Sequence, residues 1–534
     1  MTPRPDGPAA LHPAPVAPDA SPDATPLDGP DRASARQSLD RALLRGLGWT
    51  WISNWGTQIV SWLSTILVAR LLLPSDYGIV AMATVFLGLA RLMSEFGLGT
   101  VVLAMRDLSD RSVAQVNGLS MWFGVGAMGL SLLAAVPLGR FFDSAELPLV
   151  VAVMSVSFII AAARVVPYAL LQRELRFDAL ARLEVLQALV MTGTTLGLAA
   201  AGAGYWALAL GPSAGQLAAT IVNMRLRPVP FARPTKEIAA AVRFSRNILV
   251  ERVAGYGYST ADSLIIGRVL GDGPLGLYTL ARALGAIAVD KVTGMTMRVT
   301  PAIFAAAQDD APALRRYVYL ITEGLAVATF PLCVGTALVA PEFVRVFLSP
   351  EWRDVTVPLQ LVALQGVIPS ITSIFPQILV VSGESAFVAR NGVFAVIVVP
   401  IILLVGAQWG VTGVAAAWFV CLPIVRGPLF WRTRRRIDLS ARAMVRALWP
   451  ATSSALVMTG AVLGIDVLTA DTLPDPVRFA LKVGVGALAY IGSLALLHRT
   501  RVREVIASLR AMRRASSATT TSDTVSPAAP APAP

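Results

Sequence analysis

Long apolar runs separated by short polar segments fill most of the chain. Each run is close to the ~20 residues that an α-helix needs to cross a bilayer. The runs are rich in Leu, Ala and Val, and in lipid each segment must satisfy its own backbone polar groups, so the pattern predicts helices. We expect about fourteen transmembrane spans, at 47–69, 79–104, 113–137, 148–171, 180–200, 203–224, 247–267, 277–303, 317–340, 355–380, 391–407, 410–431, 449–468 and 478–498.

Loops rich in basic residues recur on only one side of the predicted membrane. Arginines cluster before the first span and after the second, fourth, sixth, eighth, twelfth and last. The intervening loops are poorer in positive charge and often acidic, as in FFDSAEL at 141–147 and TADTLPDP at 469–476. Because loops rich in Lys and Arg stay in the cytoplasm, we expect both termini to be cytoplasmic and the number of spans to be even.

One sequence unit occurs twice. LVARLLLPSDYGIVAMATVFL at 67–87 aligns with IIGRVLGDGPLGLYTLARALG at 265–285, and Gly78 then falls on Gly276. The offset equals about six spans with their loops. The pattern therefore predicts an all-α fold with two six-helix lobes in the same orientation and two further C-terminal helices. Such parallel repeats are typical of transporters whose substrate passes between the lobes.

Composition divides the chain further. The first 36 residues are rich in Pro, Ala and Asp and the last 20 in Ala, Ser, Thr and Pro, which favours disorder at both ends. The expected domains are a disordered cytoplasmic tail at 1–36, an N-lobe at 37–224, a basic cytoplasmic linker at 225–246, a C-lobe at 247–431, two added helices at 432–498, and a basic, then low-complexity, cytoplasmic tail at 499–534.

The overall composition indicates lipid as the solvent. Of the 534 residues, 55% are hydrophobic and only 15% are charged. The net charge of +12 would favour nucleic acid in a soluble protein, but the basic residues are not interleaved with aromatic ones as base stacking requires, so we expect no nucleic-acid partner. Cys333 and Cys421 lie in apolar runs, and His12 and His498 lie near the chain ends. We therefore expect no metal, no cofactor and no histidine-based catalysis.

Two stretches carry a family resemblance. ARLLLPSDYGIVAMATVFLGLARLMSEFGLG at 69–99 and DSLIIGRVLGDGPLGLYTLARALG at 262–285 resemble the starts of the two lobes of Wzx/WzxC-type lipid-linked oligosaccharide flippases. The resemblance implies the fold of the multidrug/oligosaccharide-lipid/polysaccharide exporter superfamily. It also implies transport of undecaprenyl-pyrophosphate-linked glycans across the bacterial inner membrane. The protein partners that the resemblance implies are a polysaccharide polymerase or glycosyltransferases.

Ionisable residues inside the spans are the candidate site, because each is costly in hydrocarbon unless it faces a cavity or a partner. Those singled out lie on the first, second, seventh and eighth spans, which the resemblance places around a central cavity. The cations predicted to attract the pyrophosphate, or else to form structural ion pairs, are Arg91, Arg252, Arg282 and Lys291. The carboxylates that could balance them, or bind the H⁺ or Na⁺ that drives transport, are Glu95, Glu251, Asp262 and Asp290, and Asn54 and Gln58 are predicted to line the cavity.

Other arginines receive a structural interpretation. Arg164 and Arg298 lie near cytoplasmic ends of spans, where we expect their long side chains to reach the interface. Arg70 and Arg268 lie at outer helix ends, where we expect them to cap the same corner of each lobe. Asp262 has two candidate partners, Arg268 and Arg282.

Three alternatives remain open from the sequence. A peptidoglycan-precursor flippase and a drug/cation antiporter belong to the same superfamily, although the antiporter would more typically have twelve helices and a carboxylate-centred cation site. A membrane glycosyltransferase or glycan polymerase would be an enzyme. Such an enzyme needs a large outer loop, and the outer loops here reach only about 10–15 residues, so we expect no enzymatic activity.

Overall fold

The computed structural model describes residues 64–95, 98–104, 109–235, 256–257, 259–307, 310–469 and 472–499. Every regular element in these ranges is a helix, as the apolar runs predict. The helices are α2 (Pro74–Glu95), α3 (Leu98–Ala104), α4 (Asp110–Phe142), α5 (Leu147–Ser155), α6 (Ser157–Arg173), α7 (Phe177–Ala200), α8 (Tyr205–Leu226), α10 (Ala261–Val269), α11 (Asp272–Ala306), α12 (Ala311–Phe347), η2 (Pro350–Val355), α13 (Thr356–Gln365), α14 (Val367–Thr372), α15 (Ile374–Val381), α16 (Ser385–Gly406), η3 (Ala407–Trp409), α17 (Gly410–Ile437), α18 (Ala441–Thr469) and α19 (Asp475–Leu497).

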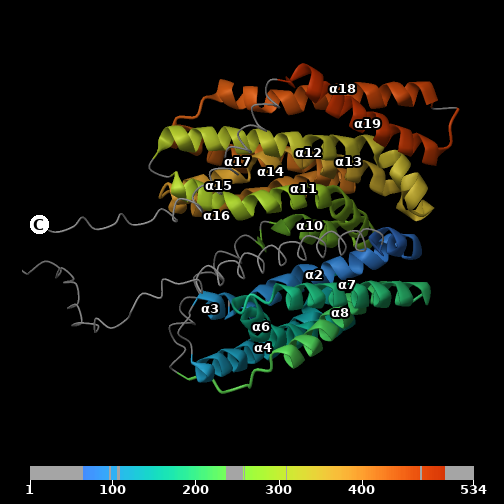
Figure 1. Ribbon diagram of the computed structural model, residues 1–534. Coiled ribbons are helices and arrows are strands. Elements are labelled where there is room, and N and C mark those ends of the chain that lie inside the picture. Colours follow the sequence, from blue (N-terminus) through green and yellow to red (C-terminus); the bar gives the residue numbers. More distant parts are fainter. Residues whose placement is uncertain are drawn as a thin grey trace, which may run out of the picture.

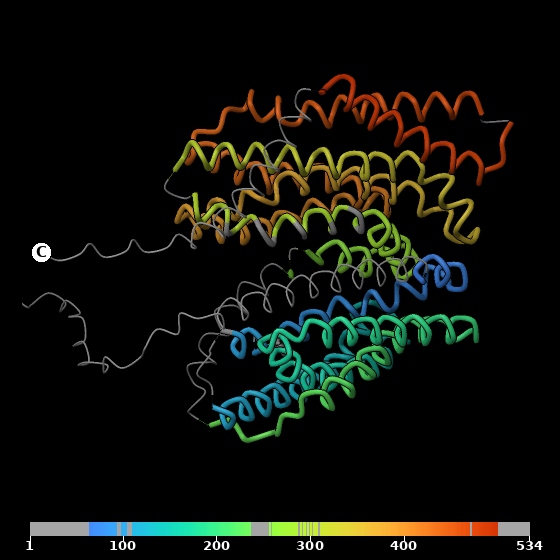
Figure 2. Tube along the Cα trace, viewed as in Figure 1, coloured from blue at the N-terminus to red at the C-terminus, as the bar shows by residue number. Residues whose placement is uncertain are grey.

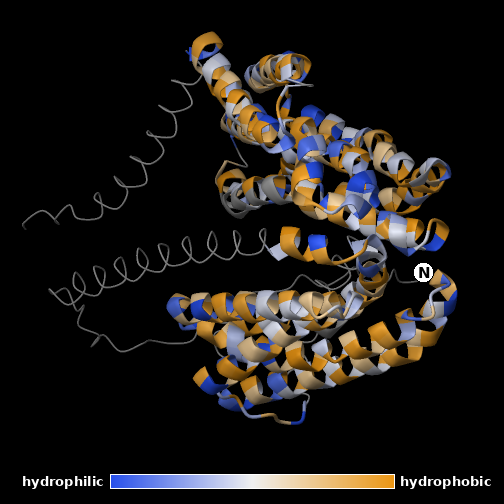
Figure 3. Cartoon of the chain, turned by 90° about the vertical axis from the view of Figure 1, so that its right-hand side faces the viewer, coloured by the Kyte–Doolittle hydropathy of each residue, from blue (hydrophilic) through white to orange (hydrophobic). Residues whose placement is uncertain are grey.

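The outer surface of the helices is suited to lipid. Within the described residues, nine helical stretches are long and apolar enough to cross a membrane, and one of them, Ser385–Ile437, holds both α16 and α17. Large apolar side chains point outward, such as Leu133 at 79% and Val467 at 84% exposure. Hydrophobic residues accordingly run along the helices of the whole molecule (Figure 3).

The helices form two groups that lie side by side (Figure 1). The first group comprises α2 to α8, and the second comprises α10 to α19. They meet chiefly where α2 packs against α11 and α10. One buried core cluster runs through this contact, with Met82 and Ala83 from α2 beside Leu275 and Ala281 from α11. The α18–α19 hairpin packs on α12, on the side of the second group away from the first (Figure 2).

The repeated unit forms the contact between the groups. A Cβ atom on Gly78 would lie 1.9 Å from the backbone oxygen of Asp272, and one on Gly276 would lie 1.7 Å from that of Pro74. In the alignment of the two copies, Pro74 corresponds to Asp272 and Gly78 to Gly276. Each copy thus places its glycine against the helix start of the other, and only glycine leaves room for so close an approach. We call this pair of contacts the reciprocal glycine crossing.

Two of the expected spans are locally irregular helices. The span predicted at 148–171 has an irregular turn at Val156, between α5 and α6, where the backbone keeps right-handed helical angles. The span predicted at 355–380 has such turns at Gly366 and Ser373, between α13, α14 and α15. These are the fourth span and the tenth, which occupy equivalent places in the predicted repeat. Hydropathy did not predict these turns, because a local irregularity leaves the apolar content of a run unchanged.

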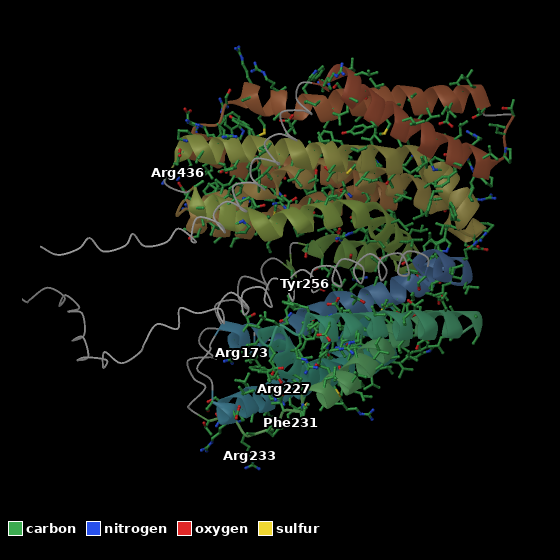
Figure 4. The ribbon with its side chains drawn as sticks, viewed as in Figure 1. Arg173, Arg227, Phe231, Arg233, Tyr256 and Arg436 are labelled. Carbon is green, nitrogen blue, oxygen red and sulfur yellow. The ribbon has the colours of Figure 1, made fainter. Side chains whose placement is uncertain are left out.

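Basic side chains gather at one end of the helices. Arg173, Arg227, Arg233 and Arg436 all lie towards the left-hand end in Figure 4, although they come from both groups. In the first group, the Arg227 Nε atom lies 2.8 Å from a carboxylate oxygen of Glu174. The loops predicted to be cytoplasmic therefore lie together at one end of the molecule.

Candidate functional site

A buried ion pair lies where the two groups meet. Asp262 on α10 is only 1% exposed, and a nitrogen of Arg282 on α11 lies 2.8 Å from its Oδ2 atom. The Tyr278 hydroxyl donates to the same oxygen at 2.8 Å, and the Trp418 indole nitrogen of α17 donates to that hydroxyl at 3.1 Å. Asp262 thus pairs with Arg282. The other candidate partner of Asp262 was Arg268. The Arg268 guanidinium instead lies over the Phe141 ring, 5.6 Å from the ring centroid.

A cavity of about 290 Å³ opens between the groups next to this pair. Tyr256 reaches across it from the second group, and its hydroxyl donates to the backbone oxygen of Val85 at 2.9 Å (Figure 4). Ser263, which lines the cavity, follows Asp262 directly and donates its backbone N–H to the carboxylate at 2.7 Å. The lining residues are Tyr77, Val80, Ala81, Thr84, Val85, Leu208, Tyr256, Thr260, Ser263 and Thr279.

A second cavity, of about 480 Å³, lies within the first group. Arg91, one of the predicted site cations, lines it, whereas Arg282 does not. Arg164 also lines it and donates to the side-chain oxygen of Gln187. The interpretation of Arg164 as a side chain that only reaches the interface was incomplete, because sequence position does not reveal which neighbours face a helix. The full lining is Arg91, Gly99, Thr100, Ala161, Arg164, Val165, Tyr168, Ala169, Gln172, Glu184, Gln187 and Gln216.

The remaining predicted site residues are placed only in part. Asp290 is exposed on α11, two turns beyond Arg282. Glu95 and Lys291 lie on α2 and α11, with side chains outside the described set, and Asn54, Gln58, Glu251 and Arg252 lie outside the described residues altogether. Among the side chains that the structure does describe, no three His, Cys, Asp or Glu residues gather as a metal site requires.

Sequence reasoning missed a charge network at the opposite end of the second group from the basic loops. Lys482 on α19 is buried, and its Nζ atom lies 2.9 Å from Glu342 on α12 and also contacts Asp466 on α18. Arg478 lies 2.8 Å from Asp466, and Arg345 lies 3.0 Å from Glu342. A signal was present, since Arg478 and Lys482 are spaced i, i+4 inside the predicted last span.

The family described as "Polysaccharide biosynthesis protein" matches residues 67–357, more than half of the chain. The chain belongs to this family. The match contains both copies of the repeated unit, the reciprocal glycine crossing and the Asp262–Arg282 pair. It confirms the resemblance drawn from the two quoted stretches.

Two curated relatives align with most of the length of this chain. The lipopolysaccharide biosynthesis protein WzxC of Escherichia coli is 23% identical over 435 residues, covering 77% of this chain and 85% of its own. The teichuronic acid biosynthesis protein TuaB of Bacillus subtilis is 23% identical over 475 residues, covering 85% of this chain and 95% of its own.

Solved structures share the fold of this family member. The lipid II flippase MurJ in an inward closed conformation aligns with a TM-score of 0.65 at 14% identity, over 85% of this chain and 100% of MurJ. An inward-facing multidrug resistance transporter of the MATE family and MOP superfamily aligns with a TM-score of 0.59 at 15% identity, over 72% of this chain and 94% of its own. The chain is therefore a multi-pass membrane protein with the fold of these transporters.

Proposed function

We propose that this chain is a flippase that moves undecaprenyl-pyrophosphate-linked oligosaccharide from the cytoplasmic to the outer leaflet of the bacterial inner membrane for polysaccharide export. Membership of the polysaccharide biosynthesis family carries this proposal, and the matched residues include the described contacts of α2 with α10 and α11 between the two helix groups. The likeness of the fold to a flippase and a multidrug transporter favours transport over glycosyl transfer or polymerisation.

The proposed architecture has fourteen spans, as two six-helix lobes followed by α18 and α19, with both termini in the cytoplasm. The alignment with MurJ over its entire length supports an arrangement of this size. The gathering of basic side chains from both groups at one end supports the orientation, since such residues favour the cytoplasmic side (Figure 4).

Transport would proceed by alternating access between the two groups. The reciprocal glycine crossing joins them at the end away from the basic loops, so the opposite, cytoplasmic end is the one that can admit a head group. Arg282 keeps 42% of its side chain exposed while Asp262 is buried, which leaves guanidinium donors for a phosphate. The other proposed cations are Arg91, Arg252 and Lys291. Asp262 balances Arg282, and the carboxylates proposed to balance the other cations or to couple transport to a H⁺ or Na⁺ gradient are Glu95, Glu251 and Asp290.

Two related functions compete with this one. A peptidoglycan-precursor flippase would share the fold and the pyrophosphate, and the family match favours the polysaccharide substrate over it. A drug/cation antiporter would centre on a carboxylate without a permanent partner. Asp262 is held by Arg282 and Tyr278, which favours an anionic substrate.

The test is export in a strain that lacks its own copy of the gene and accumulates lipid-linked glycan. The wild-type chain should restore export. Arg91→Ala, Arg252→Ala and Arg282→Ala should each lower the export rate per molecule in the membrane about tenfold or more, because a charge-assisted contact to phosphate is worth about 1.5–3 kcal/mol. Arg→Lys should retain part of the rate, since Lys keeps the charge but loses the bidentate geometry. Normal export by all three alanine variants would refute the cationic mechanism.

A further inference from the structure

The 480 Å³ cavity of the first group is polar in a molecule that is otherwise apolar. Eight of its twelve lining residues carry a polar side chain, and they come from five helices, α2, α3, α6, α7 and α8. Polar groups inside membrane helices are costly and mark substrate paths. The volume lies within the range of about 300–1,000 Å³ that is typical of small-molecule sites.

The side chains of this cavity match the chemistry of a sugar. The amides of Gln172, Gln187 and Gln216 each present a donor and an acceptor, which suits neighbouring hydroxyl groups. Tyr168 adds an aromatic ring to the same wall. Two arginines, Arg91 and Arg164, against one Glu184 leave a net positive charge, which favours a sugar that carries or adjoins an anionic group.

Part of the cavity is held rigid and part is available to a ligand. Arg164 donates to Gln187, and its guanidinium lies 4.9 Å from the centroid of the Tyr168 ring. The Tyr168 hydroxyl donates to Glu184 at 3.2 Å. The side-chain amides of Gln172 and Gln216 make no hydrogen bond to a group that the structure describes. Fixed charges beside uncommitted amides are what a binding site requires.

We propose that this cavity binds the sugar next to the pyrophosphate of the lipid-linked glycan. The inference rests on the proposed function, and it assigns to the first group a site that distinguishes a glycosylated lipid from the bare carrier. Arg91 and Arg164 face the anionic end of the head group, and the three glutamines contact hydroxyls.

The test compares two lipids on the purified full-length chain in lipid nanodiscs. One is the lipid-linked glycan extracted from the strain that lacks the gene, and the other is undecaprenyl pyrophosphate, the same carrier without its sugars. The wild-type chain should bind the glycosylated lipid at least about tenfold more tightly, as one or two hydrogen bonds to charged or amide groups allow. Gln172→Leu and Gln216→Leu should remove most of that preference and leave the affinity for undecaprenyl pyrophosphate unchanged, whereas Arg164→Met should weaken the binding of both lipids, because Arg164 faces the anionic end.

Matched controls separate binding from folding. Gln216→Leu breaks no hydrogen bond to a described residue, so it should remove preference without lowering abundance. Gln408→Leu in η3 and Arg182→Gln, whose side chain is 70% exposed, lie outside the cavity and should keep the preference. A Gln216→Leu protein with full preference would overturn this inference, as would a wild-type chain that binds both lipids equally. A wild-type chain that binds neither lipid would instead overturn the proposed function.

Discussion

Single residues show how this chain keeps charges within an apolar fold. Lys482 is buried, and it is tolerated because Glu342 and Asp466 both lie against its ammonium group. Asp262 is equally buried and is neutralised by Arg282. A buried charge that loses its partner is far more costly than the pair itself, so these residues are sensitive points.

Lys482→Met should lower the stability of the chain by about 3–5 kcal/mol, because it leaves Glu342 buried without its closest cation. The measurement is the free energy of unfolding in detergent, with the melting temperature as a first screen. Arg345→Met is the matched control, because it removes another cation from the same carboxylate but is 44% exposed. We expect Arg345→Met to cost about 0–1 kcal/mol. Equal losses for the two variants would contradict the burial argument.

Arg282→Met should also destabilise the chain, since Asp262 stays buried beneath it. Adding Asp262→Asn should recover part of the loss, with a coupling free energy of about 0.5–3 kcal/mol between the two positions. The double-mutant cycle is measured by unfolding of the four proteins. Additive losses would mean that the 2.8 Å contact contributes nothing to stability.

Residue roles were only partly predictable from the sequence. Arg282 and Asp262 were identified because both interrupt apolar runs, and their pairing was one of two open alternatives. The contact of Arg164 with Gln187 and the charge network around Lys482 were not predicted. Both depend on helix rotation and packing, which hydropathy does not encode.

At the scale of elements, the apolar runs predicted helices well. Each described helix overlaps a predicted span, although several run longer, and most of the span predicted at 47–69 and part of the span predicted at 247–267 lie outside the described residues. The repeated unit lies at equivalent ends of α2 and α11. The irregular turns at Val156, Gly366 and Ser373 were not predicted, because hydropathy does not register them, although Gly366 and Pro369 are residue types at which helices often bend. The crossing of α2 and α11 was not predicted either, because a glycine in a repeat can serve either a turn or a close contact.

Gly78→Ala should separate α2 from α11, because the added methyl would lie 1.9 Å from the oxygen of Asp272. We expect a clear fall in melting temperature and loss of glycan export, and the same for Gly276→Ala. Gly129→Ala on α4 is the control, since its Cβ would meet nothing within 4 Å. Gly129→Ala should be neutral or raise stability by up to about 1 kcal/mol, as expected for replacing a helical glycine. Equal melting temperatures and equal export for Gly78→Ala, Gly276→Ala and Gly129→Ala would refute the role of close packing.

Across the described part of the molecule, basic side chains and a network of paired charges lie at opposite ends of the helices. Basic side chains gather at one end (Figure 4), and the network of Glu342, Asp466 and Lys482 ties α12, α18 and α19 together away from them. The alternation of basic and acidic loops predicted this polarity. It could not predict that α18 and α19 would pack on α12, because no repeat or motif links them to a partner helix.

A topology reporter tests that polarity directly. An alkaline phosphatase domain, active only outside the cytoplasm, should be silent when fused after residue 500. The same domain fused after Thr472, in the turn between α18 and α19, should be active. The enzyme activity per unit of fusion protein is the measurement. A strong signal from the fusion after residue 500 would require a different number of spans.

The reciprocal glycine crossing also bears on how such a chain could arise. Gly78 contacts the start of α11, and Gly276 contacts the start of α2. Each copy therefore uses the same two surfaces, its glycine and its helix start, to contact the other copy. A contact of this kind is isologous, as in a symmetric dimer. A half-length ancestor with one copy would have been complementary to itself at this point. Gene fusion then needed to create no new interface, and later divergence of the halves could give one of them a ligand cavity while both kept their glycine.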